Sequence, residues 1–396
     1  MDFFQRVGKD CCGCSACAQA CPKACIRMQT NSEGFFFPVI DESACINCGK
    51  CERVCPVLNA NAKGTPIQSE AWAAIHKDSQ ILSHSSSGGV FSALAKVILS
   101  QGGCVFGAAF NNDCRSVQHI EIRDVSGLTS LQGSKYLQSD IADTYRQVAA
   151  ELAAGKTVLF TGTPCQVAGL RGYIGRDEER LFLVDVICHG VPSGKAWEHY
   201  LDSVEKKYGS RADAVNFRDK KHGWNQFGMA IRMTDGNHQY QRFNDNPYMR
   251  MFLRNNCLRE SCYHCIVKER KPVADMTIGD FWGVERLRLG MDSRSGVSLV
   301  LTHTEKGKAL FEQAGAELEK KQVDASEAAV NNSALTHSVA RPPERDGFYQ
   351  DLSSLSWKEM EKKYAHEELN VLLRRKIVKP VLRMIRKAVK TLTAGK

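Results

Sequence analysis

The chain has 396 residues and a formal net charge of +9, and this length allows one large domain and one small domain. Its seventeen cysteines are an odd number, which excludes complete pairing in intramolecular disulfides. No apolar run reaches the roughly 18 residues of a membrane span and no secretory signal opens the chain, so we expect a cytoplasmic protein with reduced, metal-binding thiols.

Two copies of one cysteine motif stand near the start of the chain. The pattern C-x2-C-x2-C-x3-C-P begins at Cys11 and again 34 residues later at Cys45. In such a motif three thiolates hold one [4Fe–4S] cluster and the fourth binds the other cluster. The expected ligands are Cys11, Cys14, Cys17 and Cys55 for the first cluster, and Cys45, Cys48, Cys51 and Cys21 for the second. Cys12 and Cys25 are left over.

The segment between the motifs, residues 26–41, predicts two short strands joined by a turn at Asn31 to Gly34, as in a small bacterial ferredoxin. A zinc site or a disulfide knot is the alternative, but zinc ligands normally come as two separate C-x2-C pairs. We expect a dicluster ferredoxin domain over residues 1–60, a polar linker over 61–70, an oxidoreductase domain of α/β (α+β) class over 71–345, and a basic helical tail over 346–396.

A loop rich in small residues opens the larger domain. Ser85 to Gly89 leads into an expected helix over 90–99, before a strand-like segment that begins at Cys104. Small residues at a helix start let backbone N–H groups approach an anion such as phosphate. A flexible connector with an ordinary helix cap is the alternative for this loop.

Further cysteines follow two predicted strands. Residues 158–161 and 181–187 are apolar runs that suit buried strands, and they lead to Cys165 and to Cys188 with His189. Loops after successive parallel strands often share one edge of a sheet, so the two thiols can meet. The pair Cys262 and Cys265 would complete four thiolates for a third cluster, with a zinc site or buried core cysteines as the alternatives. Cys104 and Cys114 fit ordinary buried positions.

These segments in combination resemble a known family. The ordered set SSSGGVF, GSKY, LFTGTPCQ, DVICHGVPS, the Cys262 and Cys265 pair and DMTIGDFWG is similar to the coenzyme F-420 hydrogenase/dehydrogenase beta subunit family over about residues 5 to 300. The two cysteine motifs match its members with a fused ferredoxin.

The resemblance implies non-covalent FAD in a domain without the dinucleotide fingerprint, and no G-x-G-x-x-G occurs in this chain. It also implies a [4Fe–4S] cluster beside the flavin. The implied FAD contacts are Ser86, Ser87, Gly88, Gly89, Lys135 and Tyr136. The implied cluster ligands are Cys165, Cys188, Cys262 and Cys265, with Cys257 as the competing fourth ligand. Deazaflavin is the hydride partner in the archaeal branch, but nothing in this chain identifies a deazaflavin pocket.

Flavin can exchange electrons singly with clusters and in pairs with an organic substrate. The expected function is therefore an iron–sulfur flavoprotein oxidoreductase that takes electrons from a ferredoxin-like or other low-potential donor. Surface-polysaccharide biosynthesis is one expected setting, because some bacterial relatives occur beside its enzymes. The alternatives are an electron-transfer beta subunit of a hydrogenase or dehydrogenase complex, and a non-enzymatic metal scaffold or redox sensor.

Two residues are candidates for catalysis. His189 is a candidate proton relay because the pKa of histidine suits neutral pH, although such a histidine often only hydrogen-bonds its neighbours. Asp280, in GDFWG, would bind a flavin or substrate hydroxyl, or cap a turn.

The positive charge of the chain is concentrated at its C-terminal end. Residues 371–396 hold nine Lys or Arg and no acid, while apolar residues recur at helical spacing. Such a helix would bind an anionic membrane surface at the inner face of the membrane, or pack on the enzyme or another subunit. No aromatic residues are interleaved with the charges, which argues against nucleic acid.

Overall fold

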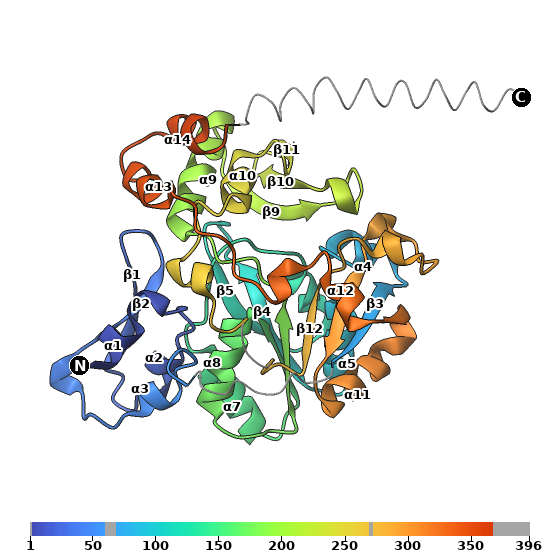
Figure 1. The fold of residues 1–396 in the computed structure, drawn as a ribbon, viewed down its shortest axis with the longest axis horizontal. Helices are drawn as coiled ribbons and strands as arrows, with labels where there is room; N and C mark the ends of the chain where they lie inside the picture. The colour runs from blue at the N-terminus through green and yellow to red at the C-terminus, as the bar shows by residue number, and fades with distance from the viewer. Residues whose placement is uncertain (1, 60–68, 269–271, 367–396) are drawn as a thin grey trace, which may run out of the picture.

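The computed structural model describes residues 2–59, 69–268 and 272–366. The main domain is built on a mixed nine-stranded sheet with the strand order β14-β3-β13-β12-β8-β7-β4-β5-β6 (Figure 1). Its strands are β3 (Glu70–His76), β4 (Cys104–Phe110), β5 (Val117–Ile122), β6 (Ser139–Asp140), β7 (Val158–Gly162), β8 (Leu181–Val186), β12 (Met276–Asp280), β13 (Ser298–Thr302) and β14 (Leu318–Val323). Strands β4, β7, β8 and β12 run parallel to one another.

Helices cover both faces of this sheet because its central strands are apolar on both sides. One face packs against α5 (Val90–Ser100) and α11 (Glu305–Gln313) through residues such as Val105, Val184 and Ile278. The opposite face packs against α7 (Thr144–Ala153) and α8 (Pro164–Ile174) through residues such as Phe160 and Leu183. The predicted helix over 90–99 and the predicted strands over 158–161 and 181–187 are therefore present.

The small N-terminal region is a separate layer beside α8 (Figure 1). It contains α1 (Asp2–Val7), α2 (Ala16–Ala20), α3 (Lys50–Arg53) and the hairpin of β1 (Ile26–Thr30) with β2 (Phe36–Ile40). The hairpin turn lies at Asn31 to Gly34, as predicted, because Asn31 accepts backbone hydrogen bonds from Glu33 and Phe35, and Gly34 adopts a φ of +83°.

A second hydrophobic core is formed around a smaller three-stranded sheet. It contains the sheet of β9 (Ala212–Asp219), β10 (Gly228–Met233) and β11 (His238–Arg242), together with α9 (Gly194–Tyr208), α10 (Pro247–Leu253), α13 (Arg345–Asp351) and α14 (Trp357–Tyr364). This core continues as far as Ala365, beyond the expected domain boundary at 345. Helices α4 (Ser79–His84), α6 (Leu128–Leu131) and α12 (Ala325–Ala329) are short connectors. The basic helix expected over 371–396 lies outside the described residues.

Candidate iron-sulfur electron-transfer site

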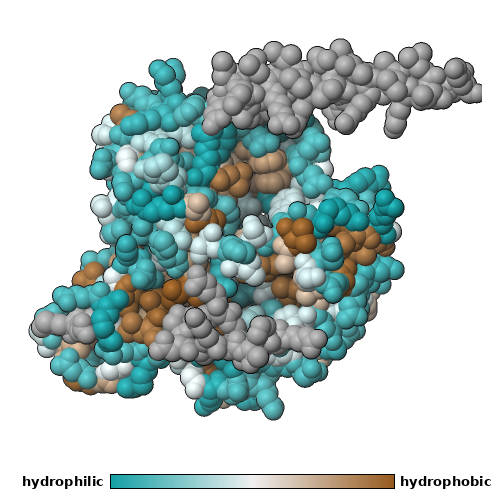
Figure 2. Space-filling model, viewed as in Figure 1, coloured by the Kyte–Doolittle hydropathy of each residue, from teal (hydrophilic) through white to brown (hydrophobic). Residues whose placement is uncertain are grey.

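The predicted ligands of the first cluster line one cavity. A space of ≈ 230 Å³ is bounded by Cys11, Cys14, Cys17 and Cys55, with apolar side chains such as Phe37 around them. Figure 2 shows hydrophobic surface on this part of the N-terminal region, around β2 and α2 as labelled in Figure 1. Four thiols in an apolar cavity match the donor set of a [4Fe–4S] cluster.

Thiols of this first set have raised pKa values, so they do not ionise readily by themselves. Burial, followed by the charges that Cys11 and Cys55 would carry, raises the pKa of Cys17 far above its ordinary value. Burial also raises the pKa of Cys55, and Cys11 and Cys51 add to that increase. Thiolates that repel one another in a buried space are stabilised by a bound cation, so the residues fit a metal cluster.

The second set consists of Cys45, Cys48, Cys51 and Cys21, which are all partly exposed. Its loop is open to solvent, because Ile46 is 57% exposed. Cys25, which the motif left over, lies against this set with its Sγ 3.2 Å from that of Cys21. The contact with Cys21, followed by burial and the neighbouring Cys45, raises the pKa of Cys25 to about 12.

The third set gathers from three separate segments of the main domain. Cys165 lies in the first turn of α8, Cys188 follows β8, and Cys262 and Cys265 lie in the short segment after residue 258. Burial raises the pKa of Cys188 well above its ordinary value, and the neighbouring Cys262, Cys165 and Cys265 add to it. The structure therefore brings the four predicted thiols together.

The surroundings of the third set suit thiolate ligands. The backbone N–H of Val191 donates to Cys262 Sγ at 3.4 Å, the kind of hydrogen bond that tunes iron–sulfur sites. Burial nevertheless raises the pKa of Cys262 to about 12. The competing candidate Cys257 lies elsewhere, in the aromatic core with Tyr248 and Tyr349. Cys104 and Cys114 are buried with 1% and 3% exposure, as expected for core residues.

The first and third sets meet at Cys12. Contact with this thiol is the largest cause of the raised pKa of Cys165, ahead of burial, and Cys12 also contacts Cys14. Helix α8 comes close at the same point, because a Cβ on Gly169 would lie 3.0 Å from Cys14 Sγ. The first set thus neighbours the third set at Cys12, and it neighbours the second set at Cys51.

A buried arginine fixes this junction. Arg259, 1% exposed, donates to the backbone oxygen of Cys11 at 2.7 Å and to that of Phe36 at 2.8 Å. Its charge lowers the pKa of Cys262, against the larger effect of burial. Neither Arg259 nor Cys12 was identified from the sequence, because no motif marks them and their partners are distant in the chain.

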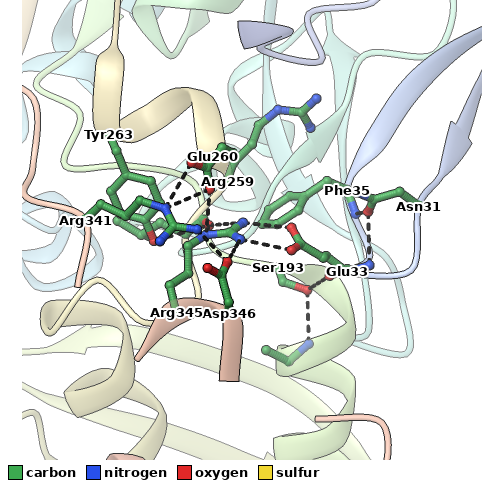
Figure 3. A network of polar contacts seen from close by, with 12 residues as sticks. Asn31, Glu33, Phe35, Ser193, Arg259, Glu260, Tyr263, Arg341, Arg345 and Asp346 are labelled. Atoms are coloured by element: carbon green, nitrogen blue, oxygen red, sulfur yellow. Dashed lines mark hydrogen bonds and ion pairs between the residues drawn. The ribbon is translucent and has the colours of Figure 1, made fainter. Parts of the chain in front are cut away.

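A polar network holds the hairpin turn of the N-terminal region on the main domain (Figure 3). Arg345 donates to both carboxylate oxygens of Glu33, at 2.9 and 2.7 Å, and Ser193 donates to the backbone oxygen of Glu33. Arg341 pairs with Glu260 on the same side of the network. The two cysteine-bearing parts are therefore docked by buried contacts.

The segments predicted to contact FAD lie side by side. Ser86 Oγ accepts hydrogen bonds from the backbone N–H and the hydroxyl of Ser134, at 2.7 and 2.8 Å, which joins the first segment to the segment that holds Lys135 and Tyr136. However, Ser87 donates to the backbone oxygen of Val297, and the N–H of Gly88 donates to Ser298. The Ser87 hydroxyl and the Gly88 N–H are thus already hydrogen-bonded within the protein.

Gly88 is required by packing. A Cβ at this position would lie 2.2 Å from the backbone oxygen of Ala74 and 2.6 Å from the backbone nitrogen of Ser298. Gly89, with a φ of +81°, precedes the first turn of α5. The N–H groups at the start of α5 are therefore the part of the predicted cradle that retains the geometry for an anion.

The two predicted catalytic residues have different surroundings. His189 Nε2 lies 2.7 Å from Asn255 Oδ1, and burial lowers the pKa of His189. Its ring contacts Phe252, which also stacks on Tyr136 with ring centroids 4.8 Å apart. The structure thus connects the residue beside Cys188 to a predicted flavin contact through one aromatic ring.

Asp280 is held by neighbours. Its carboxylate accepts from Arg218 at 2.9 and 3.2 Å and from Trp224 Nε1 at 2.8 Å. Arg218 is 4% exposed, so this is a largely buried ion pair, and it favours a positioning role for Asp280 over proton transfer.

The comparisons with known proteins match both of the cysteine-bearing parts of the chain. Residues 155–327 match the family described as the C terminus of the beta subunit of coenzyme F420 hydrogenase/dehydrogenase, and residues 10–59 match a 4Fe-4S dicluster domain. The beta-subunit match covers 173 of the 396 residues, so it is this part of the chain that is similar to the beta-subunit family. A second 4Fe-4S dicluster family matches residues 37–86, which overlap the first match. The protein is thus an iron–sulfur electron-transfer protein related to the F420 hydrogenase beta subunit.

Beyond the family matches, no curated protein matches the chain. A chain of the F420-reducing [NiFe] hydrogenase complex from Methanosarcina barkeri is 16% identical, with a TM-score of 0.46, over 74% of this chain and 89% of that chain. None of the comparisons points to surface-polysaccharide biosynthesis. Within the described residues, the helices are too short or too polar to span a bilayer.

Proposed function

We propose that this protein is the electron-transfer subunit of a hydrogenase- or dehydrogenase-type oxidoreductase and that it receives single electrons from a low-potential carrier. The proposal is supported mainly by one observation, the contact of the first cysteine set with the second set through Cys51 and with the third set through Cys12. When bound, [4Fe–4S] clusters supply one-electron chemistry at such sets.

The chain contributes the ligands and their fixed placement. Cys45, Cys48, Cys51 and Cys21 form the set that an external donor can approach, since their loop is open to solvent. Arg259 and the close approach of α8 fix the first set against the third. The N–H of Val191 stabilises a thiolate at Cys262. The partner that accepts the electrons is proposed to be another subunit, in line with the family.

The iron content of the full chain tests the proposal. Anaerobic preparation should give about twelve irons per chain, and Cys48→Ser or Cys262→Ser should each remove about four, because each belongs to a different set. The matched control is Cys114→Ala, which removes a core thiol outside the three sets and should leave the iron content unchanged. A wild-type chain with four irons or fewer would contradict the proposal.

FAD at the Ser86 and Lys135 segments is a second, finer proposal. It is supported by the hydrogen bonds from Ser134 that join the two segments, and by the contact of Tyr136 with the ring that touches His189. Flavin released by acid from the pure protein would be counted, with Ser134→Ala expected to lower it and the exposed Ser100→Ala expected to leave it unchanged. Absence of flavin from the wild-type protein would reject this proposal while leaving the first intact.

A further inference from the structure

A line of polar side chains enters the apolar centre of the main sheet. Ser69 Oγ lies 2.7 Å from His303 Nδ1, and His303 Nε2 lies 2.8 Å from Thr277 Oγ1. Thr277 is the register partner of Asp185 on the neighbouring strand β8, and its hydroxyl lies close enough to Asp185 to affect the pKa of the carboxyl group. The surrounding strand residues, such as Leu183 and Ile278, belong to the hydrophobic cores on the two faces.

Asp185 ends this line with a group that the fold leaves unsatisfied. Its side chain is 5% exposed, and its Oδ1 has no hydrogen-bond partner among the described residues. An ionised carboxylate in that position is costly, because burial removes water without supplying a full set of donors. Burial accordingly raises the pKa of Asp185 to about 7, against the lowering effect of the Thr277 hydrogen bond.

The charged groups on the adjoining strand ends are already paired. Asp275 Oδ2 accepts from the N–H of Leu183 and lies 3.4 Å from Lys306 Nζ. His303 is uncharged near neutral pH, because burial lowers its pKa to about 4. Of the groups in this line, the Thr277 hydroxyl is therefore the one that lies next to the Asp185 carboxylate.

The chemistry of the four groups fixes the direction of their hydrogen bonds. An ionised Asp185 can only accept, so the Thr277 hydroxyl donates to it and must itself accept from His303 Nε2–H. His303 Nδ1 then accepts from the Ser69 hydroxyl. Each group can take a proton from the side of Ser69 and pass one on toward Asp185, so the line can serve as a proton path whose last step crosses from Thr277 to its strand neighbour Asp185.

Asp185 also lies close in sequence to the proposed third site. Asp185 lies on β8, three residues before Cys188. It pairs with Gly162 at the end of β7, which is three residues before Cys165. Reduction of a cluster held by the third set would add negative charge just beyond the ends of these two strands, and a proton taken up on β8 would offset that charge.

We propose that Asp185 would take up a proton through Ser69, His303 and Thr277 when a cluster held by the third cysteine set is reduced. This inference rests on the proposed function. The electron comes from the low-potential carrier and the proton from solvent, and the new bond is the O–H of the Asp185 carboxyl group. Along the path, Ser69 and Thr277 each lose one hydroxyl proton and regain another, and the His303 proton moves from Nε2 to Nδ1.

Infrared difference spectra of the full iron-loaded chain, reduced minus oxidised at about pH 8, test the proposal. Reduction should produce the C=O band of a protonated carboxyl group in the wild-type protein, because Asp185, with a pKa of about 7, is mostly ionised beforehand. Asp185→Asn should abolish the band. The matched control is Glu319→Gln, which neutralises an exposed acid on β14 of the same sheet and should retain it.

A second variant tests the path separately. Thr277→Val keeps Asp185 but removes the hydroxyl that delivers the proton, so the band should appear at least tenfold more slowly after rapid photoreduction. A band that survives in Asp185→Asn, or one that forms at the wild-type rate in Thr277→Val, would overturn the proposal. Clusters that are reduced normally without any carboxyl band would reject this inference alone, whereas absence of iron–sulfur absorbance would reject the proposed function.

Discussion

At the scale of single residues, burial lowers the pKa of two lysines in the main domain, Lys135 and Lys220. Lys135 has no carboxylate among its hydrogen-bond partners, and its Nζ donates to the backbone oxygens of Ser130 and Gln132 at 3.0 and 2.8 Å. Desolvation lowers the pKa of Lys135 to about 7, and that of Lys220, on the loop after β9, to about 8. Both residues thus lie where a small change in surroundings alters their charge.

This predicts a specific dependence of stability on pH. The pKa of Lys135 is lower in the folded than in the unfolded state, so the unfolded state binds more protons above about pH 7, and the free energy of unfolding should rise with pH from there. Lys135→Met should remove part of this rise, while Lys220 maintains the part above about pH 8. Urea unfolding between about pH 7 and 8.5 measures it. The exposed Lys156→Met is the control, and an identical slope in wild type and Lys135→Met would contradict the assignment.

At the scale of elements, α8 connects the main domain to the first cysteine set. Its first turn carries Cys165, and Thr163 caps it through a reciprocal pair of hydrogen bonds with Gln166. Gly169 and Gly172, three residues apart, lie on the side that meets the N-terminal region, where a Cβ on Gly172 would lie 2.6 Å from the backbone oxygen of Val54. The two glycines therefore set how closely the two cysteine-bearing parts approach.

Adding one methyl group at this contact should disturb it. In Gly169→Ala the new Cβ would meet Cys14 Sγ at 3.0 Å and the Tyr145 hydroxyl at 2.9 Å, so we expect overpacking that costs about 1–3 kcal/mol of unfolding free energy. The low-temperature electron paramagnetic resonance signal of the first set should change as well. The control Gly347→Ala adds the same methyl in helix α13, 3.4 Å from Tyr364, and should be neutral or stabilising by about 1 kcal/mol. Equal effects at both positions would contradict this account.

The elements also show how much the sequence could predict. Local signals were sufficient for the hairpin turn at Asn31 to Gly34, for α5 and for β7 and β8, because turn chemistry and apolar runs act over a few residues. The eight N-terminal cysteines follow a fixed motif. The contact of Cys12 with Cys165 and the bonds of Arg259 could not be predicted, because they depend on how two parts that are distant in the sequence pack against each other. The role of Gly88 in packing was hidden for the same reason.

At the scale of the whole molecule, one buried ion pair reinforces the docking of the N-terminal region. Arg345 comes from α13, near the end of the described chain, and Glu33 comes from the hairpin turn. The Arg345 side chain is 2% exposed, and its guanidinium also donates to the backbone oxygen of Leu258 at 3.1 Å. The C-terminal helices therefore help to fix the position of the N-terminal cysteine sets.

Removing this arginine should loosen the docked region. Arg345→Ala leaves Glu33 without its partner, and we expect a loss of about 3 kcal/mol in unfolding free energy with faster amide hydrogen exchange in β1 and β2. Arg341→Ala is the matched control, because Arg341 pairs with Glu260 and Asp346 in the same network at 31% exposure and should cost less than about 1 kcal/mol. Hydrogen exchange followed by mass spectrometry reports both variants at peptide level. If β1 and β2 exchange equally in the two variants, the hairpin is held by other contacts, such as those of Ser193 and Arg259.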